Sequence, residues 1–256
     1  MRDSQLIHPS SIRVWRGFRN ASYQQDREGF VNKLADIFIP LTCQAMMPIG
    51  LRSYIPTLVR SDLSGMPDEI ALVGYGDQQT YYCASHDTVI GRAYGLLHDE
   101  VFNFSTEGDI PPSHSGFPVC FAGQPLKMSQ PYYFAGNPID WSVTPVTVYV
   151  VPANDQKSTA PLTAALKNAV QKNLITEAIL VQDSSYYVLW LALKSGGMVP
   201  DDIKACMSDI TGVVTSSSAT ASVPAMWTEK EGGIPIRDNE TLNLTLSSKS
   251  AWRVAS

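Results

Sequence analysis

The chain has 256 residues, of which 44% are hydrophobic and 17% charged, so it can bury a core and is not a disordered chain. Its 19 Lys and Arg residues against 24 Asp and Glu residues give a formal net charge of −5, with no basic run. Because nucleic-acid and anionic membrane surfaces need clustered positive charge, the composition argues against both as partners.

The N-terminal segment is polar, and no apolar stretch reaches the length of a signal-peptide core or a membrane helix. The four cysteines are scattered without metal-binding spacing, and we expect buried free thiols at Cys43, Cys83, Cys120 and Cys206. These features predict a cytoplasmic protein.

The first strand is predicted over residues 11–18, where β-forming side chains gather. Asp26 and Glu28 then mark the start of a helix, which Pro40 is expected to kink or end near Ile39. The apolar residues of this helix recur on one face and are Phe30, Leu34, Ile37, Phe38 and Leu41.

Two further strands are predicted over residues 51–59 and 69–75, followed by a second helix over about 76–102. On a wheel at 100° per residue, one face of that helix is expected to point at the sheet. That face carries Tyr82, His86, Val89, Ile90, Ala93 and Leu97. Residues 105–140 are rich in Gly, Pro and Ser and are predicted to be mostly loop, a lid or a linker.

The same order of elements returns in the second half. Its predicted elements are a strand at 146–151, a helix entered at Ser158, a hairpin of strands 178–182 and 186–193, a helix from Asp201, and final strands at 223–227 and 241–246. Both halves read β-α-β-β-α-β, the ferredoxin-like order with an antiparallel sheet. We therefore predict an α+β protein of two ferredoxin-like halves, at 1–140 and 141–256.

Part of the first half resembles the dimeric α+β barrel superfamily, especially its EthD-like and antibiotic-biosynthesis-monooxygenase-like members. The resemblance rests on four segments over roughly residues 11–104, which are 38–41 (FIPL), 48–54 (PIGLRSY), 69–75 (EIALVGY) and 97–102 (LHDEVF). Where many EthD-like members carry a histidine just before Pro-Leu, this chain has Ile39.

The resemblance implies a cavity between a sheet and its helices, and a tandem fusion that builds in one chain what relatives build from two. It also implies a choice of chemistries, since members of the superfamily perform cofactor-free oxygenation of aromatic polyketides, cyclisation, isomerisation or dehalogenation, or bind haem. Fold analogy does not choose among these activities.

All four histidines lie in the first 114 residues, so histidine acid–base chemistry is expected in the first half. His86 is predicted to point at the sheet, as a base, as a haem ligand, or as a core histidine bonded to a backbone carbonyl. His98 is expected at the edge of the apolar face, where it either lines the cavity mouth or is solvated at the helix end.

Arg13 is expected to share the face of Trp15 by period-2 alternation, where it would pair with a carboxylate or phenolate substrate or face solvent or a partner. The tyrosines of this half have the polar-tipped rings that line pockets for flat ligands, and they also suit an ordinary core. Those predicted to line the cavity beside Trp15 are Tyr54, Tyr75, Tyr82 and Tyr94.

The sequence contains no phosphate-binding loop, no HExxH motif and no G-x-S-x-G elbow, so neither a nucleotide cofactor nor a metal is predicted. Our hypothesis is a cytoplasmic enzyme, monomeric or homodimeric, that performs cofactor-free oxygenation, cyclisation, isomerisation or lyase chemistry on a small aromatic or polyketide-like molecule. His86 is the expected base, with Arg13 pairing an anionic group. One alternative is a haem protein with His86 or His98 as ligand. The other is a non-catalytic binding protein, whose cavity Trp15, Tyr75 and Phe30 would fill.

Overall fold

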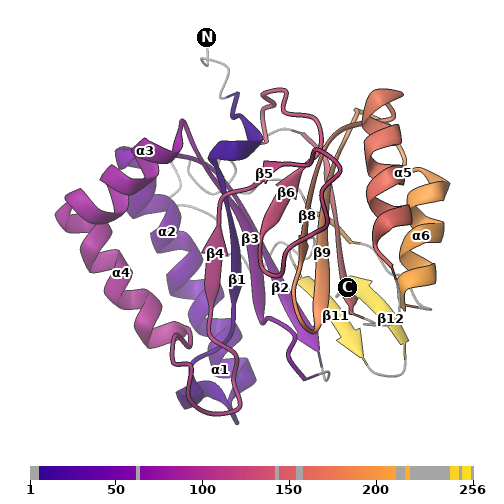
Figure 1. Ribbon diagram of the computed structural model, residues 1–256. Coiled ribbons are helices and arrows are strands. Elements are labelled where there is room, and N and C mark those ends of the chain that lie inside the picture. The colour runs from indigo at the N-terminus through magenta and orange to yellow at the C-terminus, as the bar shows by residue number, and fades with distance from the viewer. Residues whose placement is uncertain are drawn as a thin grey trace.

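The computed structural model describes residues 6–61, 64–141, 144–153 and 158–211, and three short strand segments at 217–219, 243–247 and 250–254. Two β-sheets lie face to face in the middle of the molecule, and helices cover the outer face of each (Figure 1). The layers therefore run helix, sheet, sheet, helix.

The first sheet is built around a ferredoxin-like unit. Its strands are β1 (Ile12–Gly17), β2 (Leu51–Ser61), β3 (Glu69–Tyr75) and β4 (His114–Gly116), with neighbours in the order β2-β3-β1-β4. Between β1 and β2 the chain forms α1 (Arg27–Lys33), a π-helical turn (Leu34–Phe38) and α2 (Ile39–Met46). Between β3 and β4 it forms α3 (Gln78–Tyr82), a π-helical turn (Cys83–Asp87) and α4 (Val89–Val101).

The second sheet repeats this arrangement. Its unit contains β7 (Val146–Pro152), α5 (Ala160–Gln171), β8 (Ile175–Gln182), β9 (Tyr186–Leu193), α6 (Asp201–Thr211) and β10 (Ser217–Ala219). The neighbours run β10-β7-β9-β8, which is the same order as in the first sheet. The predicted fold class of two ferredoxin-like halves is therefore confirmed by strand order.

Each sheet gains two strands from the other half of the chain. They are β5 (Val119–Cys120) and β6 (Pro131–Tyr133) beside β8, and β11 (Asn243–Ser247) and β12 (Ser250–Val254) beside β2. The region 105–140, predicted to be mostly loop with short strands such as 119–121, is mostly loop and contains three short strands, of which β5 lies at the predicted place. The predicted strand at 223–227 lies outside the described residues, and the boundary at residue 140 stays a prediction.

Alternation along the strands decides what each face contains. On β9, Val188 and Trp190 pack into the core between the sheets, whereas Leu189 and Leu191 pack against the second helical layer. On β1, Arg16 points between the sheets, and Arg13 and Trp15 point toward the first helical layer, as the alternation predicts.

A polar cluster ties the two sheets together at Arg16, which is fully buried. Its guanidinium donates to the Ser129 carbonyl at 2.9 Å and contacts His114, whose Nε2 lies 2.8 Å from an Asp183 carboxylate oxygen. Asp183 supplies the negative charge that a buried arginine requires. His114 therefore belongs to the junction between the halves.

The first long helix was predicted to kink or end near Ile39. It changes its winding there but does not end. A π turn precedes Ile39, and α2 begins with Pro40 in its first turn. Because proline has no backbone N–H to donate, a wider turn precedes it and the helix then continues.

The second helix differs from its prediction in a way that matters for the site. It breaks at Thr88, which has extended backbone angles and whose hydroxyl caps α4 by accepting from the Gly91 amide at 2.9 Å. The break rotates α4 relative to a continuous wheel, so Val89 is 74% and Ile90 50% exposed. The predicted inward face is therefore wrong.

The described cysteines form no disulfide, as predicted, but only Cys43 is fully buried and Cys120 is exposed. In the part of the chain that the structure describes, no helix combines the length and hydropathy needed to cross a bilayer.

The junction between the π turn and α4 requires glycine at position 91. A Cβ there would lie 1.9 Å from the Ala84 carbonyl oxygen, whereas a Cβ at Gly95 would meet nothing within 4 Å. We expect Gly91→Ala to lower the free energy of unfolding by about 1–3 kcal/mol. Gly95→Ala should raise it by about 0.5–1 kcal/mol through helix propensity. Urea unfolding measures both, and equal effects would contradict the close contact.

Candidate active site

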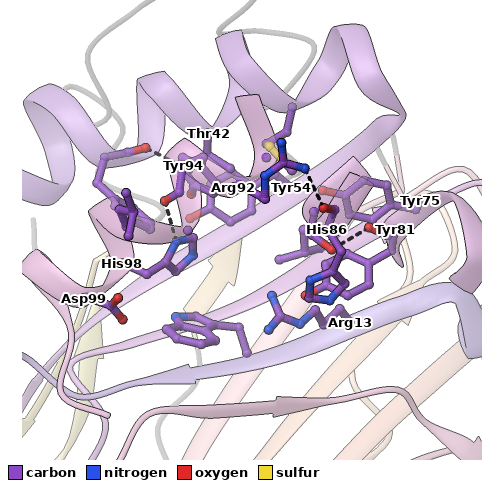
Figure 2. Close-up of a pocket in the computed structure, with 18 of the residues that line it drawn as sticks. Arg13, Thr42, Tyr54, Tyr75, Tyr81, His86, Arg92, Tyr94, His98 and Asp99 are labelled. Atoms are coloured by element: carbon purple, nitrogen blue, oxygen red, sulfur yellow. Dashed lines mark hydrogen bonds between the residues drawn. The ribbon is translucent and has the colours of Figure 1, made fainter. Parts of the chain in front are cut away.

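A cavity of about 370 Å³ lies between the first sheet and its helices, on the face of the sheet turned away from the second half. The sheet contributes Arg13, Trp15, Tyr54, Val73 and Tyr75. The helical layer closes the cavity with residues of α2, of α4 and of the turn before α4, including Thr42, Tyr94 and His98 (Figure 2). The cavity thus lies where the family resemblance implies one.

Of the residues that the sequence singled out, all but one line this cavity. Tyr82 does not; it is 45% exposed, and its ring stacks on His86 at 6.1 Å between centroids. The π turn and the break at Thr88 explain the difference, because a wheel at constant pitch does not hold across them.

His98 lies deepest among the described histidines of the cavity. Its ring packs edge-on against Tyr94, Phe38 and Trp15, at 4.6, 4.8 and 5.7 Å between centroids. Nδ1 lies 3.1 Å from the Tyr94 carbonyl oxygen, which can only accept, so Nδ1 carries the proton and donates. Burial, with a smaller contribution from the positive charge of Arg13, lowers the pKa of His98 to about 4, although the hydrogen bond to the Tyr94 carbonyl acts in the opposite direction. A neutral imidazole results at neutral pH, with its lone pair on Nε2.

His86 has a different position from the one predicted. It is exposed, at the mouth of the cavity, and its backbone carbonyl accepts a hydrogen bond of 3.0 Å from Arg92. In Figure 2 it lies above Arg13, whereas His98 lies below Tyr94. The interpretation of His86 as the inward-pointing histidine is therefore wrong, and His98 holds that position.

Of the two described arginines that line the cavity, Arg92 on α4 and Arg13 on β1, Arg13 extends from the sheet. Its guanidinium lies over the ring of Tyr81 at 4.7 Å and near that of Trp15 at 5.8 Å. Within the described residues, no carboxylate forms an ion pair with it. Cation–π contacts hold the side chain in place without neutralising its charge.

The sequence analysis missed Glu69, which is fully buried on β3 behind the cavity wall. One carboxylate oxygen accepts from the Tyr54 hydroxyl at 2.8 Å, and the other accepts from the Trp15 indole N–H at 3.0 Å. Burial raises the pKa of Glu69 to about 7, although both hydrogen bonds act in the opposite direction. The sequence did contain a signal for it, because period-2 alternation places Glu69 on the same face of β3 as Val73 and Tyr75.

Thr42 is a second residue that sequence reasoning missed. Its hydroxyl donates to the Phe38 carbonyl at 2.7 Å, so it accepts from the hydroxyl of Tyr94. These two hydrogen bonds fix the Tyr94 ring between α2 and α4 and connect the two helices above the cavity. Among the described residues, no group of three metal-ligating side chains lies close enough to hold an ion.

The ionisation of Glu69 should appear in the pH dependence of stability. Since its pKa is about 7 in the folded protein against an ordinary 4.5, the folded state retains a proton that the unfolded chain loses between these values. Stability is then lost as pH rises through this window, by up to about 3 kcal/mol. We expect the difference in unfolding free energy between wild type and Glu69→Gln to fall by that amount from pH 4.5 to 8. Urea unfolding tests this, with Glu107→Gln, at an exposed position, as the surface control; a flat difference for Glu69→Gln would contradict it.

No family model and no curated protein matches the chain. A solved structure of a candidate monooxygenase from Fusobacterium nucleatum is similar at 9% identity and a TM-score of 0.36, over 82% of this chain and 90% of that one. A candidate monooxygenase from Lactobacillus acidophilus is similar at 6% and 0.35, over 82% and 91%. An anthrone oxidase-like protein is similar at 12% and 0.29, over 86% and 91%. Likenesses this distant support no inference about activity, and the fold rests on the strand order of the two sheets.

Proposed function

We propose that the protein is a small-molecule enzyme that binds a compact anionic aromatic compound in the first-half cavity and removes a proton from it without a cofactor. The observation that carries this proposal is the pairing of an unneutralised cation, Arg13, with a neutral imidazole, His98, inside an aromatic cavity. Arg13 is partly exposed and forms no ion pair with a described carboxylate, so its charge is available to a ligand.

The walls indicate the class of ligand. A cavity of about 370 Å³ lies in the lower part of the range for small-molecule sites. The rings of Trp15, Tyr75 and Tyr94 offer faces and edges to a flat molecule. Arg13 would bind a phenolate or carboxylate oxygen at one end.

The proposed roles follow from the protonation states. His98 Nε2 is the base, because Nδ1 is committed to a carbonyl and the ring is neutral at neutral pH. Arg13 stabilises the anion that remains after the proton leaves. Oxygenation without a cofactor, cyclisation, isomerisation and lyase chemistry can each begin with such a step, so the proposal names a class of reactions and not one product.

Haem is the cofactor that the family resemblance implies, and the residues present do not fit it. His86 is exposed at the mouth, and the His98 ring is enclosed by Trp15, Phe38 and Tyr94 above a cavity of only about 370 Å³. A tetrapyrrole bound at Nε2 would need these rings to move apart. No step of the proposed reaction passes through haem.

The alternative of a non-catalytic protein predicted a cavity filled by Trp15, Tyr75 and Phe30. Trp15 and Tyr75 line an open cavity instead, and Phe30 packs in the core against Phe102 at 5.9 Å between centroids. This arrangement leaves room for a ligand and argues against a cavity filled by side chains. The expectations of a cytoplasmic location and of a monomer or homodimer stay predictions.

Binding is testable with 4-nitrophenol, whose phenolate absorbs in the visible. We expect the wild type to bind the phenolate form, and Arg13→Gln to weaken binding by about 10- to 100-fold, the loss of a charge-assisted hydrogen bond. Arg52→Gln, which changes an exposed arginine on β2 outside the cavity, is the matched control. Absorbance titration gives the affinities; equal losses in both variants would contradict the anion site.

The base is testable in a screen of phenolic and polyketide-like compounds, with product detection by mass spectrometry. For any compound that is turned over, His98→Asn should lower kcat by at least about 100-fold. His86→Asn should retain most activity, because its side chain lies at the exposed mouth. If His86→Asn lowers kcat more than His98→Asn does, His86 is the base and the assignment to His98 is overturned.

A further inference from the structure

We propose that Glu69 is the proton donor of the cavity and delivers its proton through the hydroxyl of Tyr54. This inference rests on the proposed function and deepens it, because an isomerisation or cyclisation needs both a base and a proton donor at one ligand. The proton that His98 removes from one atom is matched by one that Tyr54 returns to another.

The hydrogen bonds around Glu69 leave one path for its proton. Glu69 is fully buried and Tyr54 is 2% exposed, so bulk water does not reach the carboxyl. Among the described residues, Glu69 has two hydrogen-bond partners, Tyr54 and Trp15. An indole N–H only donates and takes up no proton, whereas a phenol hydroxyl both donates and accepts. The path therefore runs through Tyr54.

Tyr54 connects the hidden carboxyl to the ligand space, because it lines the cavity and its hydroxyl lies 2.8 Å from Glu69 Oε1. Glu69 itself is not part of the cavity lining. Trp15 holds the second carboxylate oxygen at 3.0 Å and so orients the first toward Tyr54. Three adjacent strands, β2, β3 and β1, thus supply the hydroxyl, the carboxyl and the orienting group.

The transfer balances without an oxidant or reductant. The Glu69 O–H bond breaks and its proton goes to the Tyr54 oxygen, while the Tyr54 proton goes to an oxyanion of the ligand. Tyr54 ends neutral, the ligand gains an O–H bond, and the negative charge passes to Glu69. The observed bond from the Tyr54 hydroxyl to Glu69 is the geometry that this step leaves behind.

The protonation states support this division of roles. Burial pushes the pKa of Glu69 up to about 7 and that of His98 down to about 4. Between these values the acid holds its proton and the base lacks one, so both are in working form over the same pH window. Groups whose environments displace their pKa values in this way carry acid and base assignments.

Infrared spectroscopy with 4-nitrophenol as probe tests the proposal. At pH 6 the wild type should show the C=O stretch of a protonated buried carboxyl, which Glu69→Gln removes. Saturating probe should shift this band, because a probe oxygen bound by Tyr54 changes the hydrogen bond that Glu69 makes. Tyr54→Phe should keep the band and abolish the shift, and Tyr132→Phe, a buried tyrosine of the second sheet, should keep both.

The outcomes separate the two proposals. A probe that does not bind the wild type overturns the proposed function, and the donor assignment with it. A probe that binds while the band is absent, or while the shift persists in Tyr54→Phe, overturns the donor alone, because the effect then passes through space. If Glu69→Gln does not fold, Tyr54→Phe still decides, since it leaves the carboxyl in place.

Discussion

The two sheets must each bury an apolar face, and they do so against each other. This packing places Val148, Val188 and Trp190 of one half against Ile12 and Val14 of the other and leaves little room for charge between them. Arg16 is buried in this layer beside His114, which it contacts, and beside Asp183, which bonds to His114. Free polar side chains are therefore easier to place on the outer faces of the sheets, beneath the helices. The cavity of the first half lies on such a face.

Desolvation acts on the groups of that cavity in one direction, toward neutrality. It favours a protonated carboxyl at Glu69 and an unprotonated ring at His98. Arg13 lies against aromatic faces in the same cavity. This combination of aromatic walls and a cationic side chain supports the proposal of an anionic aromatic ligand.

The order of strands and the hairpin at Asp183 could be predicted because they follow from period-2 patterns and turn residues within short windows. The face of Arg13 could be predicted for the same reason. It could not be predicted that His98, and not His86, lies inside the cavity. That outcome depends on the π turn and on Thr88, where the regular helical period is interrupted for a few residues. Glu69 was hidden for another reason: its partner Trp15 is 54 positions away, and only the pairing of β1 with β3 brings them together.

The added strands link the two halves of the chain, because each sheet contains strands from both. Because β5 and β6 extend the second sheet and β11 and β12 the first, the halves clasp each other, and a chain divided at residue 140 would give two pieces that each lack part of a sheet. The pairing of β11 with β2 also covers an edge that would otherwise be open to another strand. Within the described residues, each sheet is therefore completed by strands from the other half of the chain.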